Sequence, residues 1–218
     1  MHRRSFLTAA GAGLALAGHA FADAAKPPVK LAKAYPFLEA YLKLPAAQRS
    51  RFHPAYYLMQ DGHPAGGYRA QIIDGAARID VPVEADGRLG RLPTLAQLQG
   101  PAQFQLLAPS ALKFGLKLEV QASMPAQNQL DAHELSLAIQ QAADAVKVIA
   151  GAMAFAAPKL AAAAFPGAGA GQATLADGRS LPLVASRLGP MFEPARAPGA
   201  RLVSLTRPPS RIVLAPAA

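Results

Sequence analysis

Three of the histidines, His53, His63 and His133, are the residues of this chain best suited to acid–base or metal chemistry. Asp61-Gly62 lies between the first two and is typical of a tight hairpin turn. His53 and His63 could therefore approach each other across a hairpin, where they would suit a hydrolase. A zinc site needs three or four converging ligands, and the sequence shows no such cluster, so we expect no metal and no cofactor.

Other patterns of catalytic residues are weak or missing. His133-Glu134 lacks the second histidine of a zinc-protease helix, because Leu137 occupies that position. No Gly-x-Ser-x-Gly elbow occurs, and the glycine-rich run 167–171 has the spacing of neither a phosphate loop nor a dinucleotide turn. Carboxylate pairs of glycosidases meet only in three dimensions. A hydrolase that uses carboxylates or the two histidines therefore stays open as an alternative.

The first 22 residues have the order of an export signal: positive charge, a weakly hydrophobic run, and the small-x-small end Ala20-Phe21-Ala22. Arg3-Arg4 followed by Phe6-Leu7 resembles the twin-arginine translocation signal, although Thr8 stands where a lysine is common. The resemblance implies that the folded protein crosses the bacterial inner membrane through the twin-arginine translocase. It also implies cleavage after Ala22 and a periplasmic location.

Composition narrows the chemistry further. The absence of cysteine excludes disulfides, thiolate nucleophiles, iron–sulfur clusters and covalent haem. The 218-residue chain has a formal charge of +9. Six of its arginines lie beyond residue 178: Arg179, Arg187, Arg196, Arg201, Arg207 and Arg211. Clustered guanidinium groups can bind phosphate or carboxylate, so in the periplasm the candidate partner is an anionic envelope component and not nucleic acid. The alternative is a solvated basic surface that binds no partner.

The segment 131–165 is the only stretch with a sustained helical period. Asp131 can cap the first turn, and Glu134 stands three residues on, as in a capping box. The apolar positions recur at steps of four and three: Leu135, Ile139, Ala142, Val146, Ile149 and Met153. Pro158 kinks or ends this helix, and the alanine-rich residues beyond it would let a helix lie close against a sheet.

Short strands with Asp-Gly turns precede the helix. The ranges 56–59, 68–73 and 78–83 predict a three- or four-stranded meander. The clearest strand follows, in which Phe114, Leu116, Leu118 and Val120 alternate with polar residues, and 104–107 is a plausible neighbour. Beyond the helix we expect strands at 201–206 and 211–214 and a loop over 188–199.

These patterns predict an α+β fold in which one curved antiparallel sheet is covered by a single long amphipathic helix. Residues 23–33 are expected to form a linker and 34–218 one domain, with no stable membrane span. An apolar cleft between helix and sheet would be lined by Phe114, Leu118, Ile139, Val146 and Met153, with Arg201 and Arg207 holding an anionic group. We therefore expect a non-catalytic periplasmic binding or envelope-associated protein for an apolar or anionic ligand. The alternatives are a hydrolase and a structural or protein-interaction module.

Overall fold

The structure, a computed structural model, describes residues 26–151 and 158–218, so the expected export signal lies outside the described residues. The fold is α+β and largely β, with one long helix. The helices are α1 (Leu31–Ala34), α2 (Leu38–Lys43), the 3-10 helix η1 (Ala46–Gln48), α3 (Leu95–Gln99) and α4 (Ala132–Ala150). The strands are β1 (Val29–Lys30), β2 (Phe52–Gln60), β3 (His63–Pro64), β4 (Arg69–Asp74), β5 (Ala77–Val81), β6 (Gln103–Leu107), β7 (Phe114–Ala122), β8 (Gln129–Asp131), β9 (Ala162–Ala164), β10 (Gly171–Leu175), β11 (Ser180–Pro182), β12 (Val184–Ser186), β13 (Gly189–Phe192), β14 (Ala200–Leu205) and β15 (Val213–Ala215).

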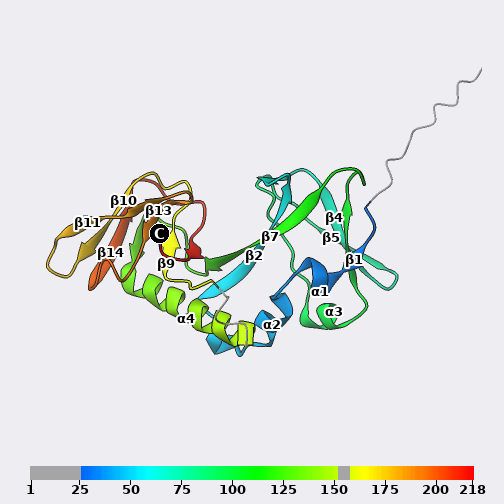
Figure 1. The fold of residues 1–218 in the computed structure, drawn as a ribbon, viewed down its shortest axis with the longest axis horizontal. Helices are drawn as coiled ribbons and strands as arrows, with labels where there is room; N and C mark the ends of the chain where they lie inside the picture. The colour runs from blue at the N-terminus through cyan, green and yellow to red at the C-terminus, as the bar shows by residue number, and fades with distance from the viewer. Residues whose placement is uncertain (1–25, 152–157) are drawn as a thin grey trace, which may run out of the picture.

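The strands form three sheets in which every recorded pairing is antiparallel (Figure 1). One end of the molecule carries the order β1-β6-β4-β5, and the other end carries β11-β10-β14-β8. A curled sheet of seven strands, β12-β13-β9-β15-β7-β2-β3, runs between them. Its longest pairing joins β2 to β7 along nine residues of each strand. We call this pair the central ribbon.

The long helix α4 begins where the sequence predicts. The Oδ1 atom of Asp131 accepts hydrogen bonds from the backbone N–H groups of His133, at 2.8 Å, and Glu134, at 2.9 Å. These bonds satisfy two of the four N–H groups that a helix start leaves unpaired. The carboxylate of Glu134 pairs with Arg51 and does not return to the capping residue, so the expected capping box is only half formed.

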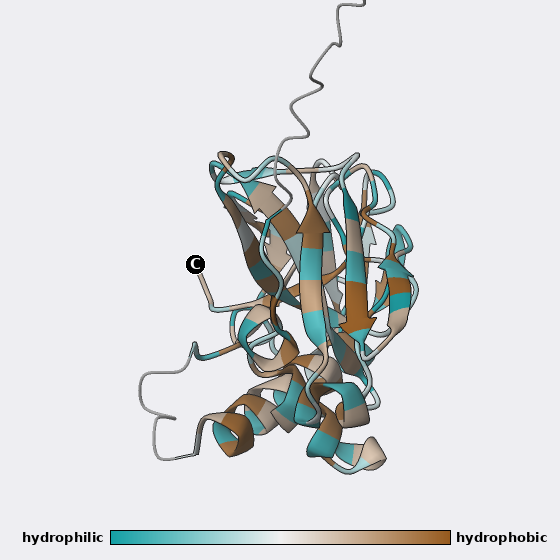
Figure 2. Cartoon of the chain, turned by 90° about the vertical axis from the view of Figure 1, so that its right-hand side faces the viewer, coloured by the Kyte–Doolittle hydropathy of each residue, from teal (hydrophilic) through white to brown (hydrophobic). Residues whose placement is uncertain are grey.

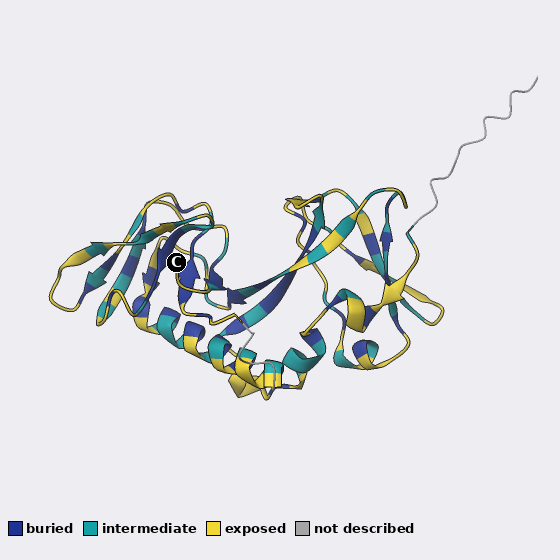
Figure 3. Ribbon diagram, in the orientation of Figure 1, coloured by how far each residue is buried: buried dark blue, intermediate teal, exposed yellow. Residues whose placement is uncertain are grey.

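Two large hydrophobic cores lie on either side of the middle of the molecule (Figure 3), and a third, small cluster contains Ala162, Ala164, Met191 and Val213. The first lies between α4 and the strands that follow β6, and the helix contributes Leu135, Ala138, Ile139 and Ala142 to it. The second surrounds α1, α2 and α3 and includes Tyr56 and Leu58 of β2. The central ribbon contributes side chains to both cores, so it ties them together.

The helical period expected over 131–165, with a kink or an end at Pro158, is confirmed as a helix from Ala132 to Ala150, and the alanine-rich part beyond Pro158 is not helical. Gly151 follows with a φ of 50°, residues 152–157 lie outside the described part, and Ala162–Ala164 form β9. This strand pairs with β13 on one side and β15 on the other, and its three alanines have 0 % exposure. Alanine suits a helix packed against a sheet, but here its small side chain suits a strand that is covered on both faces.

The predicted meander is only partly correct. β4 and β5 form the expected hairpin over Asp74-Gly75, but β2 pairs with β7 and not with them. Gly66, between β3 and β4, passes close to the backbone of Ala85. A Cβ atom there would lie 2.3 Å from the carbonyl oxygen of Ala85, so only glycine allows the chain to pass so close to that loop. The chain leaves the central ribbon before β4 begins.

Three smaller expectations are also corrected. The range 104–107 lies in β6, which pairs with β1 and β4 instead of with β7. The described part of the expected linker is folded, because Val29–Lys30 pair with β6 and Leu31 is only 1 % exposed. The expected loop 188–199 contains β13, in which Met191 and Phe192 are buried. Figure 2 shows that brown, hydrophobic residues alternate with teal, hydrophilic ones along several strands.

Candidate functional site

The two faces of the central ribbon differ in chemistry because side chains alternate along a strand. On one face the cross-strand pairs are Tyr56 with Leu118 and Pro54 with Val120. On the other face the register places His53 beside Gln121, Ala55 beside Glu119 and Tyr57 beside Lys117. The apolar face lies toward α2 and the end of α4, and the polar face lies toward the segment that leads into β15. Each face forms a candidate site.

An apolar pocket of about 450 Å³ lies between the ribbon, α2 and the last turns of α4. None of its lining residues is charged: Phe37, Tyr41, Phe52, Pro54, Tyr56, Leu118, Val120, Val146, Ile149, Ala150 and Pro158. Several of these, including Leu118, Val146 and Ile149, are only half-buried although they are aliphatic. Phe37 has a left-handed backbone, with φ at 67°, and its side chain is 62 % exposed. Such a conformation is costly for a bulky residue and is a recurrent feature of ligand sites.

The two tyrosine hydroxyls of this pocket are already hydrogen-bonded within the protein. Tyr41 donates to the backbone oxygen of Phe52 at 3.0 Å, and Tyr56 donates to the backbone oxygen of Pro36 at 2.5 Å. Burial also raises the pKa of Tyr56, so its hydroxyl stays protonated at neutral pH. Because neither hydroxyl is free to donate to a ligand, the pocket offers a guest apolar contact and little else.

The residues predicted to line a cleft are only partly brought together. Leu118 and Val146 line the apolar pocket, whereas Ile139 is 5 % exposed inside the first core. Phe114 lines a separate hollow of about 310 Å³ beside β6. Met153 lies outside the described residues. Arg201 is exposed on β14 and Arg207 is exposed just after it, and neither lines the pocket.

Sequence reasoning missed the aromatic side of the pocket. Phe37, Tyr41 and Phe52 come from α2 and from the first residue of β2, far from α4 in sequence. None of the sequence patterns described above pointed to these three residues. Their meeting with α4 depends on the long-range pairing of β2 with β7, which no local pattern indicates.

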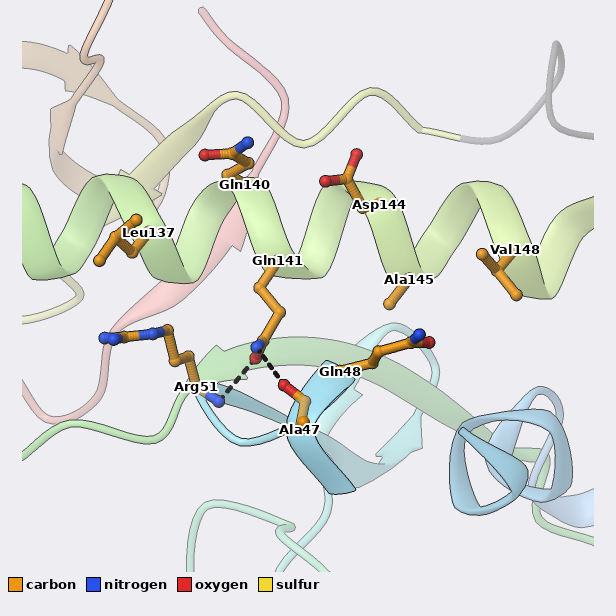
Figure 4. Close-up of a pocket in the computed structure, with 9 residues that line it drawn as sticks. All are labelled: Ala47, Gln48, Arg51, Leu137, Gln140, Gln141, Asp144, Ala145 and Val148. Atoms are coloured by element: carbon orange, nitrogen blue, oxygen red, sulfur yellow. Dashed lines mark hydrogen bonds between the residues drawn. The ribbon is translucent and has the colours of Figure 1, made fainter. Parts of the chain in front are cut away.

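A second hollow, of about 440 Å³, lies between η1 and the outer face of α4 (Figure 4). The side chain of Gln141 crosses it: Oε1 accepts from the backbone N–H of Arg51 at 2.8 Å, and Nε2 donates to the backbone oxygen of Ala47 at 2.8 Å. The guanidinium of Arg51 pairs with Glu134. Because these polar groups hold the η1 segment against α4, we interpret this hollow as structural.

The polar face of the ribbon carries a nearly buried carboxylate, Glu119, which is 5 % exposed. It accepts two hydrogen bonds from Arg211, one from Lys117 at 3.0 Å and one from Gln121 at 3.0 Å. Burial by itself would raise the pKa of Glu119, but the hydrogen bonds from Arg211 and Lys117 outweigh burial, so the pKa lies below its usual value. A carboxylate whose lone pairs are all engaged cannot act as a general base.

His53 gives limited support to the hydrolase alternative, although it lines a hollow of about 650 Å³ together with Glu84 and Asp86. Its Nδ1 atom lies 3.3 Å from the hydroxyl of Ser123, and burial, followed by the charge of Arg88, lowers the pKa of His53. A neutral imidazole beside a serine suits acyl transfer, but no carboxylate is recorded that would orient the ring among the described residues. His63 pairs with Gln60 at the other end of β2, about 20 Å away at roughly 3.3 Å per residue. The expected approach of the two histidines is therefore wrong.

One serine spacing escaped the sequence reasoning. Ser110 and Lys113 have the Ser-x-x-Lys separation of some acyl-enzymes. Both are exposed in the turn between β6 and β7, and the backbone oxygen of Ser110 accepts a hydrogen bond from Lys26 at 3.0 Å. Nothing around the Ser110 hydroxyl suggests that it is activated.

Comparison with models of known protein families, with curated proteins and with solved structures finds no significant match to this chain. Within residues 26–151 and 158–218, no three His, Asp or Glu side chains gather as a metal site requires. The helices of the same residues all lack the length or the hydropathy for crossing a bilayer. The apolar pocket is therefore the feature on which a functional proposal can rest.

Proposed function

We propose that this chain is a non-catalytic binding protein of the bacterial cell envelope, which holds an apolar molecule between the central ribbon and the end of α4. The observation that supports the proposal is the pocket of about 450 Å³ whose eleven lining residues include no charged side chain. Pockets for small molecules typically measure roughly 300–1,000 Å³ and are mainly apolar. Helix α4 forms one wall of this site, and the central ribbon forms the other.

The energetics favour a guest in this pocket. Leu118, Val146 and Ile149 are half-buried, so part of their apolar surface would be removed from water by a ligand. Burial of apolar surface contributes roughly 25 cal/mol per Å² before the cost of association is subtracted. A hydrogen-bonding ligand would gain little, because the hydroxyls of Tyr41 and Tyr56 are already engaged. The preferred guest is therefore a hydrocarbon or aromatic group.

The test is binding of the fluorescent probe N-phenyl-1-naphthylamine to the purified protein, compared between two variants. Val146→Trp places a large side chain inside the pocket. Val148→Trp adds the same side chain two residues on, at a position that is 63 % exposed and lines the second hollow. We expect the first variant to weaken probe binding by roughly tenfold or more and the second to leave it unchanged.

The protein contains no tryptophan, so the emission maximum of each variant reports how its new side chain is buried. A blue-shifted maximum for Val146→Trp and a water-like maximum for Val148→Trp would confirm the placements. Absence of probe binding by the unsubstituted protein, or equal binding by both variants, would contradict the proposal.

The envelope location rests on the first 22 residues, and it has its own experiment. Replacement of both Arg3 and Arg4 by Lys should retain the protein in the cytoplasm, because the twin-arginine translocase reads the arginine pair. Cell fractionation followed by mass measurement of the exported form checks both the route and the cleavage after Ala22. Export of the double-lysine variant at the normal level would refute the twin-arginine route.

A further inference from the structure

One arginine is held against the wall of the apolar pocket. The guanidinium carbon of Arg49 lies 5.4 Å from the ring centroid of Tyr41, which lines the pocket, and this separation suits a cation–π contact. The Nε atom of Arg49 donates to the backbone oxygen of Leu44 at 3.0 Å. The side chain is half-buried, and these two contacts fix its position.

Several other cations near this pocket are paired with carboxylates, whereas Lys159, which follows the lining residue Pro158, is exposed and takes part in no ion pair among the described residues. Lys43 bonds to Glu39 at 2.7 Å, and Lys147 bonds to Asp144 at 2.9 Å. Arg51 likewise pairs with Glu134. Among the described residues, Arg49 takes part in no ion pair, and its Nη1 and Nη2 atoms have no recorded partner. The positive charge of Arg49 therefore lies against Tyr41, which forms part of the wall of the uncharged apolar pocket.

We propose that the natural ligand is a single-chain carboxylate amphiphile, such as a fatty acid, whose hydrocarbon chain occupies the apolar pocket and whose carboxylate pairs with Arg49. This inference rests on the proposed binding function and specifies its ligand. A carboxylate suits Arg49 because the two Nη atoms can donate to its two oxygens in a bidentate pair. A single chain suits a volume of about 450 Å³, which lies toward the lower end of small-molecule pockets.

The proposal replaces the basic residues that the sequence suggested. Arg201 and Arg207 lie on and just after β14, outside the lining of the pocket, whereas Arg49, also outside the lining, stacks on the lining residue Tyr41. Arg49 was not among the binding residues expected from the sequence. Its role becomes visible through its contact with Tyr41, which itself depends on how α2 meets the ribbon.

The experiment measures displacement of N-phenyl-1-naphthylamine by saturated fatty acids of increasing length and by primary alcohols of the same lengths, below their micellar concentrations. Each buried methylene should tighten binding of either series by about fourfold until the pocket is full. At equal length the acid should bind roughly tenfold more tightly than the alcohol, because a charge-assisted hydrogen bond stabilises its complex.

Three variants test whether Arg49 causes the preference for an acid over an alcohol of equal length. Arg49→Gln should remove it while leaving alcohol binding unchanged, and Arg49→Lys should retain part of it because the charge remains. The matched control Arg201→Gln removes an exposed arginine outside the pocket and should leave both series unchanged. Thermal unfolding of each variant, together with its alcohol binding, verifies that the pocket is still folded.

The outcomes separate the two proposals. Equal binding of acids and alcohols to the unsubstituted protein, or loss of both series in Arg49→Gln, would overturn the role of Arg49 in holding the head group. Stronger binding of a single-chain phosphate lipid than of the acid would overturn the carboxylate assignment. In each of these cases the length dependence and the Val146→Trp effect would still support an apolar pocket. Failure of every amphiphile to displace the probe, with no effect of Val146→Trp, would overturn the proposed function itself.

Discussion

Arg211 holds Glu119 in a bidentate ion pair, in which Nε donates to Oε2 at 2.8 Å and Nη2 donates to Oε1 at 3.1 Å. The guanidinium also lies over the ring of Tyr57, with its carbon 5.1 Å from the ring centroid. Arg211 stands just before β15, whereas Glu119 belongs to β7 and Tyr57 to β2. The pair therefore attaches the last strand of the chain to the polar face of the central ribbon.

Replacement of Arg211 by Ala should reduce the free energy of unfolding by about 1–3 kcal/mol, because it leaves a nearly buried carboxylate with fewer partners. Urea denaturation followed by circular dichroism measures this change as a lower midpoint with an unchanged m-value. The control is Arg201→Ala, which removes an exposed arginine from β14 and should change stability by less than about 0.5 kcal/mol. Similar midpoints for the two variants would show that the ion pair contributes little.

Glu119 should also make stability depend on acid pH. Hydrogen bonds keep its pKa below the usual value in the folded state, so the unfolded chain binds the proton first as pH falls. Its contribution is complete above the usual carboxyl pKa, roughly 4.3, and is lost as pH drops through the lower, folded value. In Glu119→Gln, stability should be lower at pH 7 and should fall less between neutral and acid pH. An acid limb as steep as that of the unsubstituted protein would refute this assignment.

The pKa of His53 is also shifted, and the structure gives the physical causes of the shift. Burial lowers its pKa most, and the positive charge of Arg88 lowers it further. Arg88→Gln removes the charge but not the burial, so the pKa of His53 should rise and still remain below about 6.5. The proton chemical shifts of the imidazole ring, followed by NMR against pH, measure it directly. The exposed His133 serves as the internal reference, and equal movement of both histidines would point to a general effect instead of a local one.

Local sequence patterns predicted the elements that depend on neighbours in sequence. Asp131 caps α4 as expected, and the Asp74-Gly75 pair forms the turn between β4 and β5. The alternation around Leu118 correctly indicated a strand. These features arise from capping and turn chemistry and from side-chain alternation, which act over a few residues.

Features that depend on distant parts of the chain escaped this reasoning. The pairing of β2 with β7 brings Tyr56 to Leu118, and without it the aromatic wall of the apolar pocket cannot be foreseen. Arg49 was missed for the same reason, because its contact with Tyr41 gives it a place beside the pocket. The sequence therefore predicted the pocket residues Leu118 and Val146, but it did not predict the aromatic residues near α2.

The alanine strand β9 shows how tertiary packing overrides local preference. Ala163 has 0 % exposure and lies between Phe192 of β13 and Leu214 of β15, on the face that belongs to the first core. Alanine has the highest intrinsic helix propensity, but that preference amounts to less than about 1 kcal/mol per residue and is easily outweighed by burial. A strand in this position needs small side chains because larger residues already fill the space on both sides.

Ala163→Leu should therefore destabilise the protein by about 1–3 kcal/mol, because a close-packed interior cannot accept the added methylenes without displacing Phe192 or Leu214. Ala161→Leu is the matched control, since Ala161 is exposed just before the strand and should tolerate the same change within about 0.5 kcal/mol. Thermal and urea unfolding of both variants measure the difference. Equal stability of the two variants would contradict the close packing of β9.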